Sequence, residues 1–203
     1  MRLALPLAAV AAAATLAHAR PGAPLPSTVG LRVQTRPVRD ACVAETRIIT
    51  VGAAGDPAPL VAALTTAPIR GLDFDPANPQ HAQRSTRRFA AWFKAAQDRY
   101  ERALDVELRA FTAPGATVDV KLGAVVRAVH LRSQFAYLLR ALEIPRSVRA
   151  IPDGRRAFCE ALDEQAQALD QAADEARQRC RELVASAGLG AGPWTTTCAA
   201  TAP

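Results

Sequence analysis

Apolar residues recur every three or four positions through most of the chain after residue 85. This spacing places them on one face of a helix, while Arg, Asp and Glu fill the opposite face. The pattern predicts amphipathic helices over residues 85–111, 118–143 and 153–187, separated by short breaks that contain Pro and Gly. The stripe of the first helix consists of Phe89, Trp92, Phe93, Ala96, Tyr100, Ala103, Leu104, Leu108 and Phe111.

Residues that favour helix ends mark the bounds of these segments. Ser85 and Asp153 are of the types that cap helix N-termini. Gly188 follows the third helix and fits a left-handed C-cap, with Leu189 able to make its hydrophobic contact. Long helices with short connections pack antiparallel. We therefore expect an all-α protein, an elongated three-helix bundle with antiparallel long helices and short N-terminal additions.

The N-terminal part of the chain is organised differently. Residues 1–19 have a basic start, an Ala-, Leu- and Val-rich run and an A-x-A site at 17–19, which is typical of a secretory signal peptide. Residues 20–41 hold four prolines and are expected to form an extended arm. Residues 42–203 would form the helical domain, in which 43–51 is compatible with a short strand or a helical turn.

Export would place the four cysteines in an oxidising compartment, where they can form two disulfides. Cys159 and Cys180 lie on one predicted helix, about 31 Å apart at a rise of about 1.5 Å per residue. A disulfide requires Cα atoms within about 7 Å. A turn over residues 188–193 would bring Cys198 back alongside Cys180. We therefore predict the pairs Cys42–Cys159 and Cys180–Cys198.

The chain is basic, with 25 Lys and Arg residues against 19 Asp and Glu and a formal net charge of +6. Two interpretations are open: a compositional preference for Arg, or an anionic partner such as a lipid head group or a polysaccharide. Nucleic acid is not expected, because aromatic and basic residues do not interleave. No apolar run after residue 19 approaches the roughly 20 residues that span a bilayer, so we predict no transmembrane segment in the mature chain.

Candidate chemistry is sparse. His81 is expected in the loop after Pro79 and His130 on the second predicted helix, but no motif places a nucleophile beside either. The cysteine spacings lack the C-x2-C pairs of zinc sites and the C-x-x-C of redox sites. Asp73 and Asp75 offer carboxylates for calcium without the remaining ligands of a recognisable loop. We therefore expect no metal site, no cofactor and no catalytic residue.

Arg84, Arg87 and Arg88 form a basic cluster at the start of the first predicted helix, where the helix dipole disfavours positive charge. The cluster is either a simple exposed charge run or a contact for an acidic partner. We expect an exported, non-catalytic protein, periplasmic or secreted, that binds another cell-envelope or extracellular component, either a protein or an anionic component. The alternatives are a small-molecule carrier with a pocket between helices and, further, a hydrolase or inhibitor.

Overall fold

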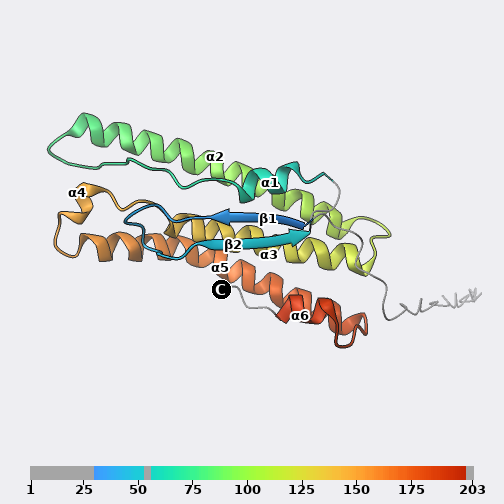
Figure 1. Cartoon of the computed structure of the whole chain (residues 1–203). Coiled ribbons are helices and arrows are strands. Elements are labelled where there is room, and N and C mark those ends of the chain that lie inside the picture. The colour runs from blue at the N-terminus through green and yellow to red at the C-terminus, as the bar shows by residue number, and fades with distance from the viewer. Residues whose placement is uncertain (1–29, 53–55, 200–203) are drawn as a thin grey trace, which may run out of the picture.

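The computed structural model describes residues 30–52 and 56–199. The predicted signal peptide over residues 1–19 and the first part of the predicted arm lie outside the described residues. Helices make up 65% of the described residues, and the rest includes one small two-stranded sheet (Figure 1). The protein is therefore mainly helical, as the sequence predicts.

The described elements follow one another as strands, then helices. They are β1 (Gly30–Thr35), β2 (Arg47–Gly52), α1 (Ala58–Leu64), α2 (Pro79–Thr112), α3 (Val118–Arg140), α4 (Arg146–Arg149), α5 (Gly154–Ser186) and α6 (Pro193–Ala199).

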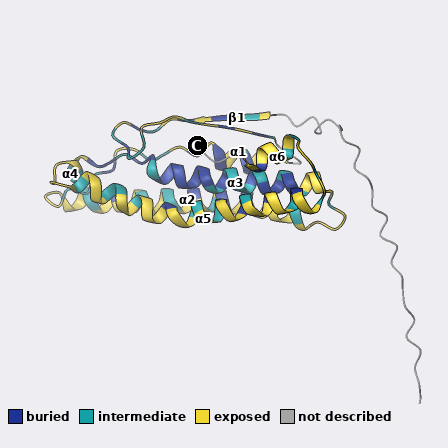
Figure 2. Ribbon diagram, turned by 90° about the horizontal axis from the view of Figure 1, so that it is seen from below, coloured by how far each residue is buried: buried dark blue, intermediate teal, exposed yellow. Residues whose placement is uncertain are grey.

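The helix α3 lies at the centre of the long helices. It packs most extensively against α5 and next against α2, and side chains on most of its circumference are buried (Figure 2). The outer faces of α2 and α5 are exposed and carry the charged residues. The long helices thus run side by side as predicted, but a three-helix bundle as such is not confirmed, because the contacts centre on α3 and the core includes the sheet and α1.

The sheet is an antiparallel hairpin that the all-α prediction did not include. Val33 of β1 pairs with Ile49 of β2, and both side chains point into the main core together with Val51. Alternation of buried and exposed residues along both strands explains the pairing, since one face packs and the other meets water. The stretch 43–51, compatible with strand or helix, therefore forms a strand over most of its length, and residues 30–35 of the predicted arm form its partner.

The N-terminus of α2 corrects the predicted helix start. Asn78 caps the helix, because its side chain accepts a hydrogen bond from the backbone N–H of His81 at 3.1 Å. Ser85 is not the cap: it is fully buried, and its hydroxyl accepts a hydrogen bond from the backbone N–H of Asp73 at 3.0 Å. His81, expected in the loop after Pro79, lies instead in the first turn of α2, which corrects that prediction.

The two ends of α5 differ in how well the sequence predicts them. Gly188 has φ 63° and donates to the carbonyl of Ala185 at 3.1 Å, while the N–H of Leu189 donates to the carbonyl of Val184 at 3.1 Å. These two bonds are those of a Schellman C-cap, so the predicted left-handed cap is confirmed. At the other end Asp153 holds the N-cap position, but its side chain makes no capping hydrogen bond.

The four cysteines stand in two pairs at disulfide distance, and the pairs are those that the sequence predicts. Cys42 meets Cys159, and Cys180 meets Cys198, each with a Cα–Cα distance of 5.5 Å. The first pair ties the segment before β2 to the first turns of α5, and the second ties α6 to the end of α5. Trp194 packs in the same cluster as the second pair.

Candidate functional site

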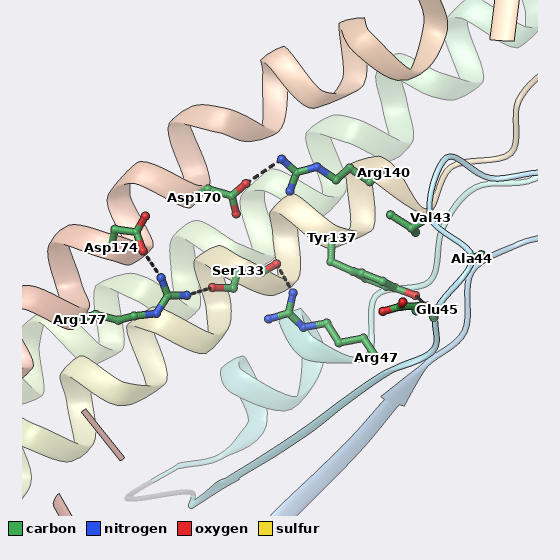
Figure 3. A pocket seen from close by; sticks show the side chains of 10 residues that line it. All are labelled: Val43, Ala44, Glu45, Arg47, Ser133, Tyr137, Arg140, Asp170, Asp174 and Arg177. Atoms are coloured by element: carbon green, nitrogen blue, oxygen red, sulfur yellow. Dashed lines mark hydrogen bonds and ion pairs between the residues drawn. The ribbon is translucent and has the colours of Figure 1, made fainter. Parts of the chain in front are cut away.

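A polar pocket of about 520 Å³ opens between α3, α5 and the segment that leads into β2 (Figure 3). It combines arginines, carboxylates and a tyrosine with small apolar side chains. The lining residues are Val43, Ala44, Glu45, Arg47, Ser133, Tyr137, Arg140, Asp170, Asp174 and Arg177.

Helical spacing explains how two helices supply most of the lining. Residues at positions i, i+4 and i+7 share one helix face. On α3 these positions are Ser133, Tyr137 and Arg140, and on α5 they are Asp170, Asp174 and Arg177. Because α3 and α5 pack along their length, the two faces meet at the pocket.

Residues 43–47 form the third wall, and hydrogen bonds between α3 and backbone groups of this segment hold it in place. The N–H of Val43 donates to the carbonyl of Arg140 at 3.3 Å. The hydroxyl of Tyr137 lies 2.8 Å from the carbonyl oxygen of Glu45 and 3.3 Å from that of Thr35. Burial raises the pKa of Tyr137, so this hydroxyl remains a neutral donor near pH 7. The tyrosine therefore anchors both this wall and the end of β1.

Arg47 is the arginine of the pocket that pairs with no carboxylate among the described residues. Its Nη1 donates to the carbonyl of Ser133 at 2.8 Å, and its Cζ lies 5.7 Å from the centroid of the Tyr137 ring. Among the described residues its Nε is buried without a hydrogen-bond partner, its Nη2 makes no hydrogen bond, and no carboxylate pairs with it. Burial lowers the pKa of Arg47, yet a guanidinium keeps its charge near pH 7. Its Nε and Nη2 therefore form an edge with unused hydrogen-bond donors, of which the buried Nε can reach an anion only after the side chain shifts.

Arg177 approaches Ser133 from the α5 side. Its Nη2 donates to the Ser133 hydroxyl at 3.1 Å, and its Nη1 pairs with the exposed carboxylate of Asp174. Its Nε is also buried without a partner among the described residues. A buried donor without a partner loses the hydrogen bonds that it makes with water, at a cost of about 1–3 kcal/mol. Two such donors, on Arg47 and Arg177, flank the same serine (Figure 3).

Arg140, by contrast, pairs with two carboxylates. It binds Asp163 at 2.6 Å and Asp170 at 2.7 Å, so it joins α3 to α5 at one side of the pocket. Burial alone would lower the pKa of Arg140, but hydrogen bonds with Asp170 and Asp163 carry it above its ordinary value. Its charge is thus neutralised within the protein.

His130 lies close to the two arginines, three residues before Ser133 on α3. Burial, together with the charges of Arg47 and Arg177, lowers the pKa of His130 to about 4. The imidazole is therefore neutral near pH 7. Among the described residues no hydrogen bond joins it to a carboxylate or to a hydroxyl nucleophile.

The predicted contact residues Arg84, Arg87 and Arg88 lie on the first turns of α2 and do not reach the pocket. All are exposed. Arg88 donates to the carbonyls of Arg70 and Gly71, each at 3.0 Å, and therefore also fixes the loop before α2. The structure brings the three arginines together on one surface.

The remaining predicted features do not assemble a metal site in the described part of the chain. Asp75 accepts a hydrogen bond from the backbone N–H of Ala77, and the residues described include no group of three or more His, Cys, Asp or Glu placed to hold a metal ion. None of the described helices combines the length and apolar character that crossing a bilayer requires. Neither a protein-family model, nor a curated protein, nor a solved structure matches this chain significantly.

Proposed function

We propose that this protein is an exported, non-catalytic binding protein that holds an anionic group of an envelope or extracellular component in the pocket around Arg47. The observation that supports this function is the free edge of Arg47, with Nε and Nη2 unpartnered among the described residues. The planar edge of a guanidinium matches a carboxylate or a phosphate in two parallel hydrogen bonds.

The charges of the lining indicate the charge of the ligand. Three arginines face three carboxylates in the pocket, but Arg140 takes up Asp170 and Arg177 pairs with Asp174. Among the described residues Arg47 is left without a carboxylate partner, and the side chain of Glu45 is exposed. A ligand with one carboxylate or phosphate group would complete this arrangement.

The volume of the pocket and the apolar side chains in its lining indicate the size and character of the ligand beyond its acidic group. A volume of about 520 Å³ lies within the range of roughly 300–1,000 Å³ that small-molecule sites occupy. The ring of Tyr137 and the side chain of Val43 offer apolar contact beside the arginines. The site therefore suits a small molecule, or a small part of a larger one, that carries an acidic group. The same pocket would serve the binding role and the alternative role of a small-molecule carrier.

We also propose that the protein is exported and that its helices form a rigid scaffold for the pocket. Two cysteine pairs at disulfide distance favour an oxidising compartment, the periplasm or the outside of the cell, and agree with a signal peptide at residues 1–19. We further propose that the long helices serve as a bundle-like scaffold whose α3–α5 face holds the pocket residues in place.

Calorimetric titration tests the proposal with benzoate, phenyl phosphate and inorganic phosphate as probes. We expect at least one probe to saturate a single site, and Arg47→Gln to weaken that binding about tenfold or more, because two charge-assisted hydrogen bonds are lost. Arg102→Gln is the matched control, since Arg102 is exposed on α2 away from the pocket. Equal affinity of the wild type and Arg47→Gln, or no saturable binding of any probe, would contradict the proposal.

A further inference from the structure

One end of the molecule carries the excess positive charge. This basic end consists of residues 39–40, 70–88 and 143–156, which hold nine Arg residues against five Asp and Glu. The other described residues hold fourteen basic and fourteen acidic side chains. The net charge of the described chain thus lies at this end.

Hydrogen bonds hold the three segments of the basic end together. The N–H of Gly71 donates to Glu143 at 2.8 Å, and the Arg149–Asp40 ion pair has a distance of 2.6 Å. The start of α2, the short helix α4 and the start of α5 accordingly lie at the same end of the elongated molecule (Figure 1). The charge therefore belongs to one surface.

Part of this charge is free to meet a partner. Arg84 and Arg146 are exposed and form no ion pair among the described residues, and Arg87 bonds only to the neutral side chain of Gln83. The acidic residues of this end are taken up in part: Asp40 pairs with Arg149, and Glu143 accepts from the backbone. The surface thus presents unpaired guanidinium groups.

An exposed apolar residue lies within the same surface. Ile151, in the turn between α4 and α5, is 57% exposed and stands between Arg149 and Arg155 in the chain. The turn is tight, since a Cβ on Gly154 would lie 2.1 Å from the carbonyl oxygen of Val148. Two backbone bonds, from Ile151 to Val148 and from Gly154 to Ile151, close it. The turn therefore holds Ile151 outward.

We propose that this basic end docks onto a bilayer surface that contains anionic phospholipid, with the arginines against the head groups and Ile151 at the acyl boundary. Each arginine near an anionic bilayer adds favourable electrostatic energy, and an apolar side chain adds to it by leaving water. The exposed isoleucine favours a lipid surface over an anionic polysaccharide, because a sugar polymer offers it no apolar environment. The role is peripheral and separate from the pocket around Arg47.

Co-sedimentation with vesicles tests the docking surface. We expect the full chain to bind vesicles of phosphatidylethanolamine with phosphatidylglycerol, more weakly at high salt, and not to bind vesicles of phosphatidylcholine. The triple variant Arg84→Gln/Arg87→Gln/Arg146→Gln should bind at least about tenfold more weakly. The control Arg99→Gln/Arg102→Gln/Arg179→Gln removes the same charge from exposed positions outside the basic end and should bind like the wild type.

A second variant separates the apolar contribution from the charge. Ile151→Ser should weaken vesicle binding by about threefold or more while leaving the salt dependence unchanged. Circular dichroism confirms that each variant is folded before binding is compared. Equal loss in the two triple variants, unchanged binding in Ile151→Ser, or preferential binding to a soluble polyuronate over the anionic vesicles would overturn the proposal.

Discussion

The guanidinium group of Arg47 lies over the ring of Tyr137, with its Cζ 5.7 Å from the ring centroid. The hydroxyl of the same tyrosine is 2.8 Å from the carbonyl oxygen of Glu45, two residues before Arg47. One side chain of α3 therefore positions both the arginine and the chain segment that carries it. The attraction between a cation and an aromatic face also helps to keep the unpaired charge of Arg47 within the protein.

Removal of the Tyr137 hydroxyl should weaken this wall of the pocket. Tyr137→Phe keeps the ring under Arg47 but leaves the Glu45 carbonyl without its partner, so we expect the free energy of unfolding to fall by about 1 kcal/mol. Tyr100→Phe is a matched control, because the Tyr100 hydroxyl is buried and has no partner among the described residues. That variant should be as stable as the wild type or more stable in urea unfolding. The opposite order of the two variants would show that the hydroxyl of Tyr137 does not hold the wall.

The stability of the protein should depend on pH through His130. Burial, with the charges of Arg47 and Arg177, lowers its pKa from 6.5 to about 4 in the folded state. Between these values the unfolded chain binds a proton that the folded chain does not. The stability that His130 contributes is therefore present above pH 6.5 and is lost as the pH falls toward 4, by up to about 3 kcal/mol.

Urea unfolding at a series of pH values measures this contribution. We expect His130→Gln to lose less stability than the wild type between pH 6.5 and 4. A bound anion between the two arginines should raise the pKa of His130, which NMR titration of the imidazole would detect. An identical pH dependence in His130→Gln and the wild type would contradict the prediction.

Much of the helical framework follows from residue patterns that act over short distances. The periodic apolar stripes predict the long helices, and Gly188 with Leu189 predicts the end of α5, because these features depend on neighbours within a few residues. The start of α2 was wrongly placed at Ser85, since a buried serine that binds a distant backbone N–H looks like a cap in the sequence.

The pocket depends on long-range contacts that no local pattern reveals. Arg47 meets Ser133, 86 positions later in the chain, and only the folded hairpin brings them together. The one local signal is the spacing of Ser133, Tyr137 and Arg140, which places these three side chains on one face of α3. The sequence does not predict the hairpin, because each strand has only six residues and so short an apolar run is compatible with either a strand or a helical turn.

The two cysteine pairs should differ in their effect on stability. Cys42 and Cys159 are 117 residues apart, and a crosslink over such a loop contributes about 5 kcal/mol in the chain-entropy treatment. Cys180 and Cys198 are 18 residues apart, for which the corresponding value is about 3 kcal/mol. Cys42→Ala/Cys159→Ala should therefore lower the unfolding midpoint more than Cys180→Ala/Cys198→Ala.

The first double variant should also weaken probe binding, because Cys42 precedes the wall of the pocket formed by residues 43–47. The second should leave it unchanged. Urea unfolding and calorimetry on the same preparations check both statements. Equal midpoints for the two double variants would contradict the assigned loop lengths.

Removal of only one partner of the buried ion pair between Glu107 and Arg127 should strongly lower the free energy of unfolding. The two side chains are almost fully buried, with Nε of Arg127 2.8 Å from the Glu107 carboxylate. Burial raises the pKa of Glu107, and Arg127 opposes that shift. Arg127→Met leaves an uncompensated buried carboxyl group and should cost about 3–5 kcal/mol, whereas Glu107→Met/Arg127→Met should cost less. A loss in the double variant equal to the sum of the losses in Arg127→Met and Glu107→Met would show that the pair is not coupled.

The most direct test of the proposed binding role is an NMR titration that follows the arginine Nε–Hε resonances with benzoate and phenyl phosphate as probes. We predict that the Arg47 resonance shifts saturably with the dissociation constant measured by calorimetry, that Arg177 shifts with it, and that Arg102 does not move. An Arg47 resonance that stays in place while a probe binds, or shifts that grow linearly and equally for all arginines, would contradict an anion site at Arg47.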